Sequence, residues 1–215
     1  MRILKAGILE HELVDGEMRR LQKMRIAREI ADTIIFVEHP EIITIGPRAK
    51  REGVEIPEGF ASRGVDRGGG LTWHGKGQVV AYPIIEWKKQ GEENVARIVN
   101  ILEEWILSAL RTLGIEGRRD ERMQGVWVGD NKVASIGLSF FHWTSRHGFT
   151  INYDTPEGRL ELVSGCGLGE ATTTSLSALG FSPKCDDIHN ALIETVGVLK
   201  REITEIVEVG LPPWA

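Results

Sequence analysis

The sequence has few cysteines, no long hydrophobic run and no excess of positive charge, and each shortage excludes a class of protein. Its two cysteines, Cys166 and Cys185, are too few for a disulfide framework or a zinc knuckle. No apolar segment approaches the roughly 20 residues of a membrane span, and Glu10 and His11 interrupt the first apolar segment too early for a signal peptide. The net charge of -5 argues against nucleic acid as the main partner. We therefore expect a cytoplasmic protein that binds neither nucleic acid nor membranes.

The composition that remains is typical of a globular protein. The 215 residues are 41% hydrophobic and 27% charged, which is enough to bury a substantial core. The 25 glycines favour loops and tight turns over a helical bundle. No repeat, low-complexity tract or convincing linker interrupts the chain, so we expect a single domain over residues 1–215, and a monomer.

Hydrophobic periodicity predicts a mixture of helices and strands. Apolar residues at spacings of three and four predict amphipathic helices over 13–30, 92–113 and 186–207. Runs of β-branched and aromatic residues predict strands at 2–8, 32–40, 41–46, 78–85 and 146–153. Two apolar segments flank Gly129-Asp130-Asn131, which predicts a hairpin. The expected fold class is therefore α+β, with a mixed sheet.

The stretch RGGGLTWHGKGQ, residues 67–78, comes close to a phosphate loop. Gly70, Gly75 and Lys76 fit the spacing G-x-x-x-x-G-K, but Gly77 stands where the magnesium-binding serine or threonine belongs. A phosphate loop also needs a helix directly after it, whereas residues 78–85 are strand-like. We therefore do not interpret the stretch as a nucleotide site.

Two interpretations of this glycine-rich stretch remain. The first is a flexible turn without a ligand. The second is one wall of a ligand site, because glycines let a ligand lie against the backbone. The polar side chains interleaved with the glycines favour the second interpretation; they are Arg67, Thr72, His74 and Gln78.

Cys166 has a more accessible sequence setting than Cys185. It lies between glycines in VSGCGLGEATTTSL, whereas Cys185 stands beside charged residues at the start of a predicted helix. Isolated cysteines usually act as small hydrophobic residues, and a nucleophilic cysteine needs a group that ionises its thiol. One candidate is Lys132, which is alternatively a solvated turn lysine. The others are His142 and His147 in a predicted turn, where no third metal ligand is near.

Six segments of the chain follow the order of one known family. They are EHPEIITIG at 38–46, RGGGLTWHGKGQVVAYPI at 67–84, GVWVGDNKVASIG at 125–137, RHGFTIN at 146–152, SGCGL at 164–168 and TTSL at 173–176. Together they resemble the octanoyltransferase, or lipoyl(octanoyl) transferase, family, whose members attach octanoyl groups to lipoyl domains. The resemblance covers most of the chain.

This resemblance implies a fold, a mechanism and a set of site residues. The fold would be that of the biotin/lipoate protein ligase (BPL/LPL) catalytic domain, an α/β mixed sheet flanked by helices. Cys166 would be the nucleophile that carries the acyl group as a thioester, and Lys132 would lie close to it and lower the pKa of its thiol. The acyl pocket would be lined by Arg67, Gly68, Gly69, Gly70, Leu71, Thr72, Trp73, His74, Ser135, Ile136, Gly137, Gly148, Phe149 and Thr150. Neither a metal nor a cofactor is implied, because transfer between two thioesters needs no ATP.

The resemblance also implies partners. The donor would be octanoyl-acyl carrier protein, and the acceptors would be lysines of the lipoyl domains of 2-oxoacid dehydrogenase complexes and of the glycine cleavage H protein. Such carriers are commonly acidic, so this acidic chain needs a local basic patch for docking. Two candidate patches, each alternatively an ordinary solvated surface, are Arg118, Arg119 and Arg122, and Arg48, Lys50 and Arg51.

With this resemblance, we interpret the glycines of 67–78 as a floor for an eight-carbon chain, with Thr72 and His74 orienting its reacting end. Replacing Gly70 or Gly75 by valine should then weaken octanoyl transfer more than acetyl transfer. The chain departs from the family pattern at Trp73 (tyrosine in the family), Lys76 (proline) and Gly165 (proline), which bears on chain-length preference and loop order.

Three other functions remain as alternatives. An ATP-dependent lipoate-protein ligase of the same fold would use Lys132 on an acyl-adenylate and would not need Cys166. A thioester hydrolase would use the same thiol with water as the acceptor. A non-catalytic acyl-binding protein would bind octanoyl groups without forming a covalent bond.

Overall fold

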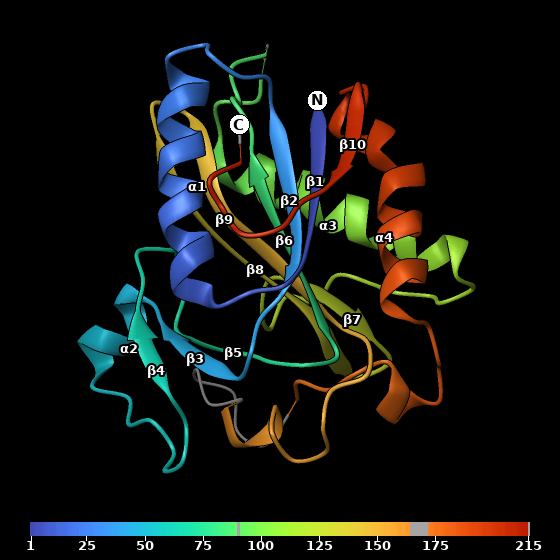
Figure 1. Ribbon diagram of the computed structural model, residues 1–215. Helices are drawn as coiled ribbons and strands as arrows, with labels where there is room; N and C mark the ends of the chain where they lie inside the picture. The colour runs from blue at the N-terminus through green and yellow to red at the C-terminus, as the bar shows by residue number, and fades with distance from the viewer. Residues whose placement is uncertain (90, 164–171, 215) are drawn as a thin grey trace.

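The computed structural model describes residues 1–89, 91–163 and 172–214 (Figure 1). In chain order, its helices and strands are β1 (Arg2–Ile8), α1 (His11–Ile26), β2 (Thr33–Glu38), β3 (Ile42–Ile45), α2 (Pro47–Glu52), β4 (Ser62–Gly64), β5 (Leu71–His74), β6 (Gln78–Ile84), α3 (Val95–Thr112), β7 (Val126–Val128), β8 (Asn131–Phe141), β9 (Thr144–Asn152), α4 (Cys185–Glu194) and β10 (Glu205–Glu208), with short 3-10 helices at Glu161–Val163, Ser177–Leu179 and Val196–Leu199. The predicted α+β class is confirmed.

A mixed sheet forms the centre of the described residues. Its strand order is β10-β1-β2-β6-β9-β8-β7. β1 runs parallel to β10 and β2, and the remaining neighbours are antiparallel. The central strands β2, β6 and β9 are buried along their whole length. Burial on both faces explains why β2 and β6 read as nearly continuous apolar runs, whereas β9 buries several polar side chains. Both faces of the sheet therefore need a covering layer.

Helices supply that layer on both faces (Figure 1). α3 and α4 pack on one face around Trp105, and α1 packs on the other through Val14, Met18 and Leu21. The α3 residues that recur at spacings of three and four form its buried stripe, and the side chain of Asn94 caps its first turn. In the described part of the chain, no helix is both long and apolar enough to cross a membrane.

A second, three-stranded sheet has the order β4-β3-β5. It contains the predicted strand at 41–46 as β3, whereas α2, β4 and β5 were not predicted. β5 shows that the glycine-rich stretch is partly a strand, pairing Thr72 with Thr44 and His74 with Ile42. A separate apolar cluster that includes Ile43 and Trp73 supports this sheet.

The predicted helix over 186–207 is wrong in its second half. α4 ends at Glu194, and residues Glu205–Glu208 form β10, which pairs in parallel with β1. Lys200 between them has a left-handed φ of 52°, which an α-helix does not accept. Ile203 and Ile206 continue the helical spacing by coincidence, because a pairing with the other end of the chain decides their conformation. The predicted helix over 13–30 likewise ends earlier, at Ile26.

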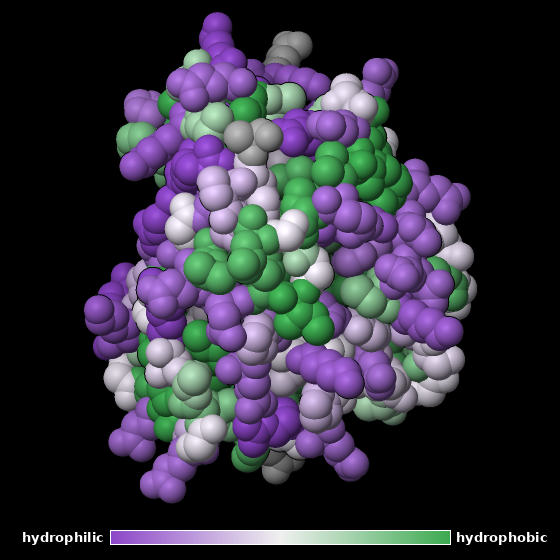
Figure 2. All heavy atoms as spheres, viewed as in Figure 1, coloured by the Kyte–Doolittle hydropathy of each residue, from purple (hydrophilic) through white to green (hydrophobic). Residues whose placement is uncertain are grey.

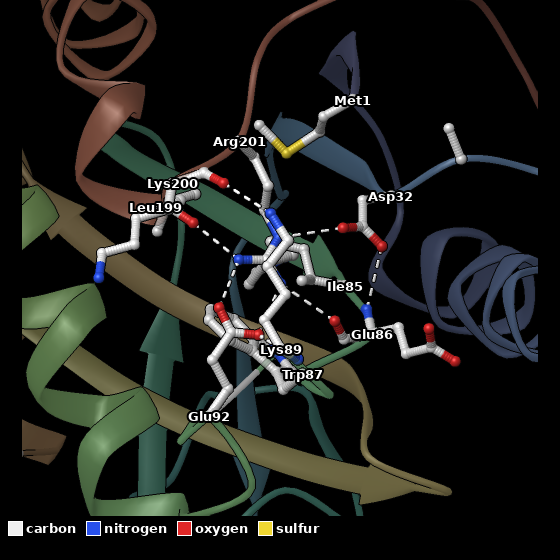
Figure 3. A network of polar contacts seen from close by, with 12 residues as sticks. Met1, Asp32, Ile85, Glu86, Trp87, Lys89, Glu92, Leu199, Lys200 and Arg201 are labelled. Atoms are coloured by element: carbon white, nitrogen blue, oxygen red, sulfur yellow. Dashed lines mark hydrogen bonds and ion pairs between the residues drawn. The ribbon is translucent and has the colours of Figure 1, made fainter.

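Arg201 fixes the turn between α4 and β10 (Figure 3). Its guanidinium group donates to Asp32 (3.0 Å), twice to Glu92 (2.7 and 2.9 Å), and to the carbonyl oxygens of Leu199 (2.7 Å) and Glu86 (3.0 Å). All five of its N–H groups therefore have an acceptor. We call these five residues the Arg201 cluster. It joins three segments that are distant in sequence, at Asp32, at Glu86 and Glu92, and at Leu199 and Arg201.

Candidate functional site

Two cavities adjoin between the small sheet and the strands β6, β9 and β8. The larger cavity has a volume of about 580 Å³ and is lined by the 67–73 segment, by parts of β8 and β9, and by residues of 121–124 and 160–163. The smaller one, of about 30 Å³, is called the inner chamber; its walls are His11, Thr44, Arg67, Thr72, His74, Val80, Tyr82, 135–137 and 147–150. Arg67, Thr72, Ser135, Ile136 and Thr150 line both cavities, so the two are adjacent and share one wall.

The residues predicted to line the acyl pocket all face one or other of these cavities. Those on the larger cavity are Arg67, Gly68, Gly69, Gly70, Leu71, Thr72, Trp73, Ser135, Ile136 and Thr150. His74, Gly137, Gly148 and Phe149 face the inner chamber. Three segments that are far apart in sequence are thus brought around two adjacent cavities.

Lys132 lies near the start of β8 on the wall of the larger cavity. It is only 5% exposed, so the alternative of a solvated turn lysine is wrong. Its backbone N–H donates to Thr172 O (2.7 Å), and Thr174 N–H donates to Lys132 O (2.9 Å), which holds the segment 172–174 alongside β8.

Cys166 lies outside the described residues, as does Gly165. The described chain on either side of them reaches the larger cavity, because Val163 and Thr173 both line it. Cys185, in contrast, is on α4 and lines neither cavity. Burial and the nearby Glu38 carboxylate raise the pKa of the Cys185 thiol to about 12, which keeps it protonated. Cys185 is thus unsuited to nucleophilic attack.

Two glycines that face each other on β8 and β9 leave no side chain on the sheet where these strands face the cavities. Gly137 and Gly148 pair across the strands. A Cβ on Gly148 would lie 1.9 Å from Ala81 O, and one on Gly137 would lie 2.9 Å from Gly68 O. The backbone of the glycine-rich segment can approach β8 this closely only because no side chain intervenes.

Gly75 has a different role from the one predicted. Gly75 lines neither of the two cavities. A Cβ at this position would lie 2.2 Å from Cζ2 of Trp73. A Gly75→Val change would displace the Trp73 ring, so it does not test contact with an acyl chain. Lys76 is exposed in the turn between β5 and β6, away from the cavity walls.

Trp73 is tied to the segment that precedes residue 164. Its indole N–H donates to Glu41 Oε1 (3.0 Å), and the same carboxylate accepts from Arg159 Nε (2.7 Å). The Arg159 hydrogen bond, with the Trp73 bond as a smaller contribution, lowers the pKa of Glu41. The residue that departs from the family's tyrosine therefore anchors a loop as well as lining the cavity.

A chain of side-chain hydrogen bonds orients His74. Gln78 Nε2 donates to Trp73 O and to Asn152 Oδ1, both at 2.9 Å. Gln78 Oε1 therefore accepts from the Nδ1–H of His74 (2.8 Å), which leaves the Nε2 of His74 as an acceptor near Thr44 Oγ1 (3.3 Å). Asn152 was not singled out from the sequence, although an asparagine at the end of a buried strand was a possible signal.

Three buried histidines, His11, His39 and His74, cluster beside the inner chamber, which His11 and His74 line, and the sequence analysis identified only His74. The ring centroids of His11, His39 and His74 lie 5.2 to 5.8 Å apart. Burial lowers the pKa of His11 to about 3 and that of His39 to about 4, and it holds the pKa of His74 well below its usual value. The cluster is therefore uncharged at neutral pH.

Hydrogen bonds orient His39 but leave one atom of His11 unused. His39 Nδ1–H donates to Leu9 O (2.7 Å), so its Nε2 accepts from the hydroxyl of Tyr82 (2.9 Å). His11 is 2% exposed, and its Nδ1 has no hydrogen-bond partner among the described residues. This is an unusual state for a buried polar atom.

His142 and His147 do not share a turn as predicted. His142 is exposed in the turn between β8 and β9, whereas His147 is buried within β9. The Nε2 of His147 lies 2.8 Å from Asp66 Oδ1, and this contact is the main cause that lowers the pKa of Asp66. Among the described residues, no group of three histidine, cysteine or acidic side chains is arranged to hold a metal ion.

The first predicted docking patch is largely neutralised. Each arginine has an acidic partner: Arg118 and Arg122 pair with Asp120 and Asp130, and Arg119 pairs with Glu103 and Glu104. The patch on α2 is different, because within the described ranges Arg48, Lys50 and Arg51 have no ion pair, and Arg48 reaches the larger cavity. α2 is therefore the more basic of the two surfaces.

An apolar surface lies elsewhere on the molecule. Figure 2 shows apolar atoms over β10 and the C-terminal segment. Ile206 and Leu211 are the exposed large apolar residues of these elements, and neither lines a cavity. This surface is separate from the candidate site.

Comparison with known structures supports the fold. The chain is similar to a bi-partite lipoate protein ligase from Thermoplasma acidophilum, with a TM-score of 0.68 and 15% identity over 98% of this chain and 87% of that one. It is also similar to the biotin protein ligase of Aquifex aeolicus in complex with biotin and ATP, with a TM-score of 0.57 and 13% identity over 93% and 70% of the two chains. The predicted BPL/LPL fold is confirmed.

Sequence comparison identifies the family. The profile of the lipoyl protein ligase A/B catalytic domain matches residues 17–197. An octanoyltransferase of Syntrophobacter fumaroxidans is 35% identical, over 88% of this chain and 86% of its own length. One from Chloroflexus aggregans is 37% identical, over 91% and 93% of the two. The chain is therefore a member of the octanoyltransferase family, built on a lipoyl protein ligase A/B catalytic domain.

Proposed function

We propose that this chain transfers an octanoyl group from acyl carrier protein to a lysine of a lipoyl domain, with Cys166 as the acyl carrier. Its family membership makes it an acyltransferase. The observation that carries the finer proposal is the buried Lys132 on a cavity that Val163 and Thr173 also line. Cys166 is three residues after Val163, and such a stretch spans at most about 11 Å, which supports the proposal that the thiol and the ammonium group act together.

In the first half-reaction, the thiolate of Cys166 attacks the carbonyl carbon of the octanoyl thioester. The bond from that carbon to the pantetheine sulfur breaks, and the departing sulfur takes a proton from the ammonium group of Lys132. The ammonium group also favours the thiolate before attack, because a nearby positive charge stabilises the charged form of the thiol. One residue thus ionises the nucleophile and protonates the leaving group.

In the second half-reaction, the amine of the acceptor lysine attacks the Cys166 thioester. The carbon–sulfur bond breaks, an amide forms, and the proton of the amine passes to the now neutral Lys132. The thiolate and the ammonium group are restored together, so the cycle balances without a cofactor. An amide is more stable than a thioester, which makes this step effectively irreversible.

The acyl chain would lie between the glycine-rich segment and the paired strands β8 and β9. Gly68, Gly69 and Gly70 present backbone rather than side chains to the larger cavity, which suits contact with a flat chain. Backbone N–H groups of this segment are candidate donors to the oxyanion that forms on the carbonyl oxygen. Thr72 and His74 would position the chain from the other side of β5.

Docking of the acidic carrier would use the basic surface of α2. Its unpaired cations stand next to the larger cavity through Arg48. The proposed acceptors are the lipoyl domains of 2-oxoacid dehydrogenase complexes and the glycine cleavage H protein. Their cargo arrives on a long arm, so the contact area need not be large.

Mass spectrometry of the intact protein tests this function. Mixing with octanoyl-acyl carrier protein should add one octanoyl group, and peptide mapping should locate it on Cys166. The Cys166→Ala variant should gain no mass, whereas Cys185→Ala is the matched control and should behave as the unaltered protein. Modification of a lipoyl domain by the Cys166→Ala variant with ATP and free lipoate would instead support a lipoate-protein ligase.

A further inference from the structure

Arg48 differs from the other arginines that line the larger cavity, because the rest of the described chain does not engage its guanidinium group. Arg67 donates two hydrogen bonds to Thr44, and Arg122 pairs with Asp120 at 2.8 Å. Arg48 lines the same cavity, and within the described ranges its side chain has neither an ion pair nor a hydrogen bond. Its charge is therefore open to a ligand in the cavity.

Burial restricts which atoms of Arg48 a ligand can reach. The Nε is buried without a partner. The two terminal amino groups also make no hydrogen bond among the described residues, but unlike Nε they keep some accessible surface. They form a planar fork that matches two oxygens of one phosphate group. The accessible end of Arg48 thus suits an anion with two or more oxygens.

The backbone of Arg48 is fixed against the glycine-rich segment. Arg48 N–H donates to Gly69 O (3.2 Å), and Gly46 N–H donates to Gly70 O (2.9 Å). A Cβ on Gly46 would lie 2.4 Å from Gly69 O, so a residue with a side chain would push the two segments apart. The start of α2 therefore holds Arg48 beside a wall of the cavity that the glycines also line.

The acidic side chains on the cavity do not cancel this charge. Glu52 and Glu121 line the larger cavity, and both are exposed. Neither forms an ion pair with Arg48, and exposed charges are screened by salt. Arg48 is half-buried, so its interaction with a ligand in the cavity is screened less.

We propose that the terminal amino groups of Arg48 bind the phosphate of the phosphopantetheine arm that presents the octanoyl thioester. This inference rests on the proposed function, in which the thioester reacts beside Lys132, on the same cavity. The arm has its sulfur at one end and its only anionic group, a phosphate, at the other. Binding of the phosphate by Arg48 directs the sulfur end towards Lys132. Arg48 thus contributes to donor binding without touching the reacting atoms.

Two small donors that differ only in the phosphate test this contact. Octanoyl-phosphopantetheine should acylate the protein with a kcat/KM about tenfold above that of octanoyl-pantetheine, because only the first donor makes the charge-assisted hydrogen bonds. In Arg48→Met, the ratio of the two values should fall to near one. Arg122→Met is the matched control, since Arg122 lines the same cavity but is paired with Asp120, and this variant should keep the preference. A preference that Arg48→Met retains, or that both variants lose equally, overturns the proposal.

Calorimetry with the unacylated arm tests the phosphate contact apart from the reaction. Free phosphopantetheine should bind the unaltered protein about tenfold more tightly than pantetheine, and Arg48→Met should remove this difference. Equal binding of the two compounds to the unaltered protein overturns the proposal, even where octanoyl transfer succeeds. If neither octanoyl donor acylates the protein, the proposed function fails, and the calorimetry still decides whether Arg48 binds the phosphate.

Discussion

The Arg201 cluster and the inner chamber are both buried polar clusters assembled from distant segments, but they differ in how their polar atoms are satisfied. In the Arg201 cluster, every N–H of the guanidinium group has an acceptor, and the carboxylates of Asp32 and Glu92 balance its charge (Figure 3). Beside the inner chamber, His11 and His39 are uncharged and His11 Nδ1 has no partner among the described residues. One cluster is complete, and the other leaves a buried polar atom without a hydrogen bond.

This difference separates a structural role from a functional one. A complete network of buried charges holds segments in a single arrangement, and nothing is left for it to bind. An incomplete cluster beside a cavity has a cost in stability, which is common at functional sites. Substitutions in the two regions should therefore affect different measurements.

The largest effect is expected for Lys132, which lies on the wall of the larger cavity. Lys132→Met should reduce the rate of octanoyl transfer by about 10²- to 10⁴-fold, because the general acid and base is lost. The free energy of unfolding should not fall, since methionine fits a buried position. Stopped-flow acylation as a function of pH measures the first effect. Lys76→Met, in an exposed turn, is the matched control, and a loss of similar size there would remove the distinction between the two lysines.

The reverse pattern is expected for the Arg201 cluster. Arg201→Met leaves the buried Glu92 carboxylate without its cation and Asp32 with Arg25 as its remaining partner, and it should lower the free energy of unfolding by about 3–5 kcal/mol. Octanoyl transfer per folded molecule should stay unchanged, because no member of this cluster lines either cavity. Urea titration and activity of the same samples measure both quantities. A selective loss of activity in this variant would show that the cluster also serves the site.

Acid should lower the free energy of unfolding through the buried histidines beside the chamber before it affects the Arg201 cluster. The pKa values of His11 and His39 fall from 6.5 to about 3 and about 4 on folding, so below pH 6.5 only the unfolded chain takes up their protons. Stability should therefore fall as pH drops from 6.5 towards 4, by up to about 1.4 kcal/mol per pH unit for each histidine. Glu92, whose pKa is lowered from 4.5, loses its contribution only below that value. The free energy of unfolding in urea should differ less between pH 7 and pH 5 for His39→Gln than for the unaltered protein. An equal difference in the two proteins would contradict the role of His39.

The smallest effect is expected on the surface. Replacing Lys50 and Arg51 by glutamine should raise KM for the acyl carrier protein a few-fold at low salt, and the difference should disappear at high salt because exposed charges are screened. The matched control replaces Arg118 and Arg122, whose charges are already paired with Asp120. An equal rise in KM for both pairs of changes would argue against α2 as the docking surface.

Sequence reasoning reached the walls of the cavities through short segments that are recognisable locally. The segment 67–74 carries its own pattern of glycines and polar residues, whereas 135–137, 148–150 and the role of Lys132 were predicted from the resemblance to the family. The helices α1 and α3 were recognisable for the same reason, since their apolar spacing is a local property.

It failed where distant residues decide the outcome. His11, His39 and His74 are separated by a helix and a strand, so nothing in the sequence indicated that their rings meet. The segment at Ile206 has helical spacing, yet it is a strand because β1 offers an edge to pair with. The role of Gly75 was also hidden, because its reason lies in the position of the Trp73 ring.

The contact from Trp73 through Glu41 to Arg159 has a consequence for how these three positions vary among relatives. The indole reaches this carboxylate with its N–H group. A tyrosine at the same position would have to donate from its phenol hydroxyl, which lies farther from the backbone. Replacement of Trp73 should therefore be tolerated best when positions 41 and 159 change with it. Relatives that carry tyrosine here are expected to differ at those two positions as well, so that the three residues evolve as a unit.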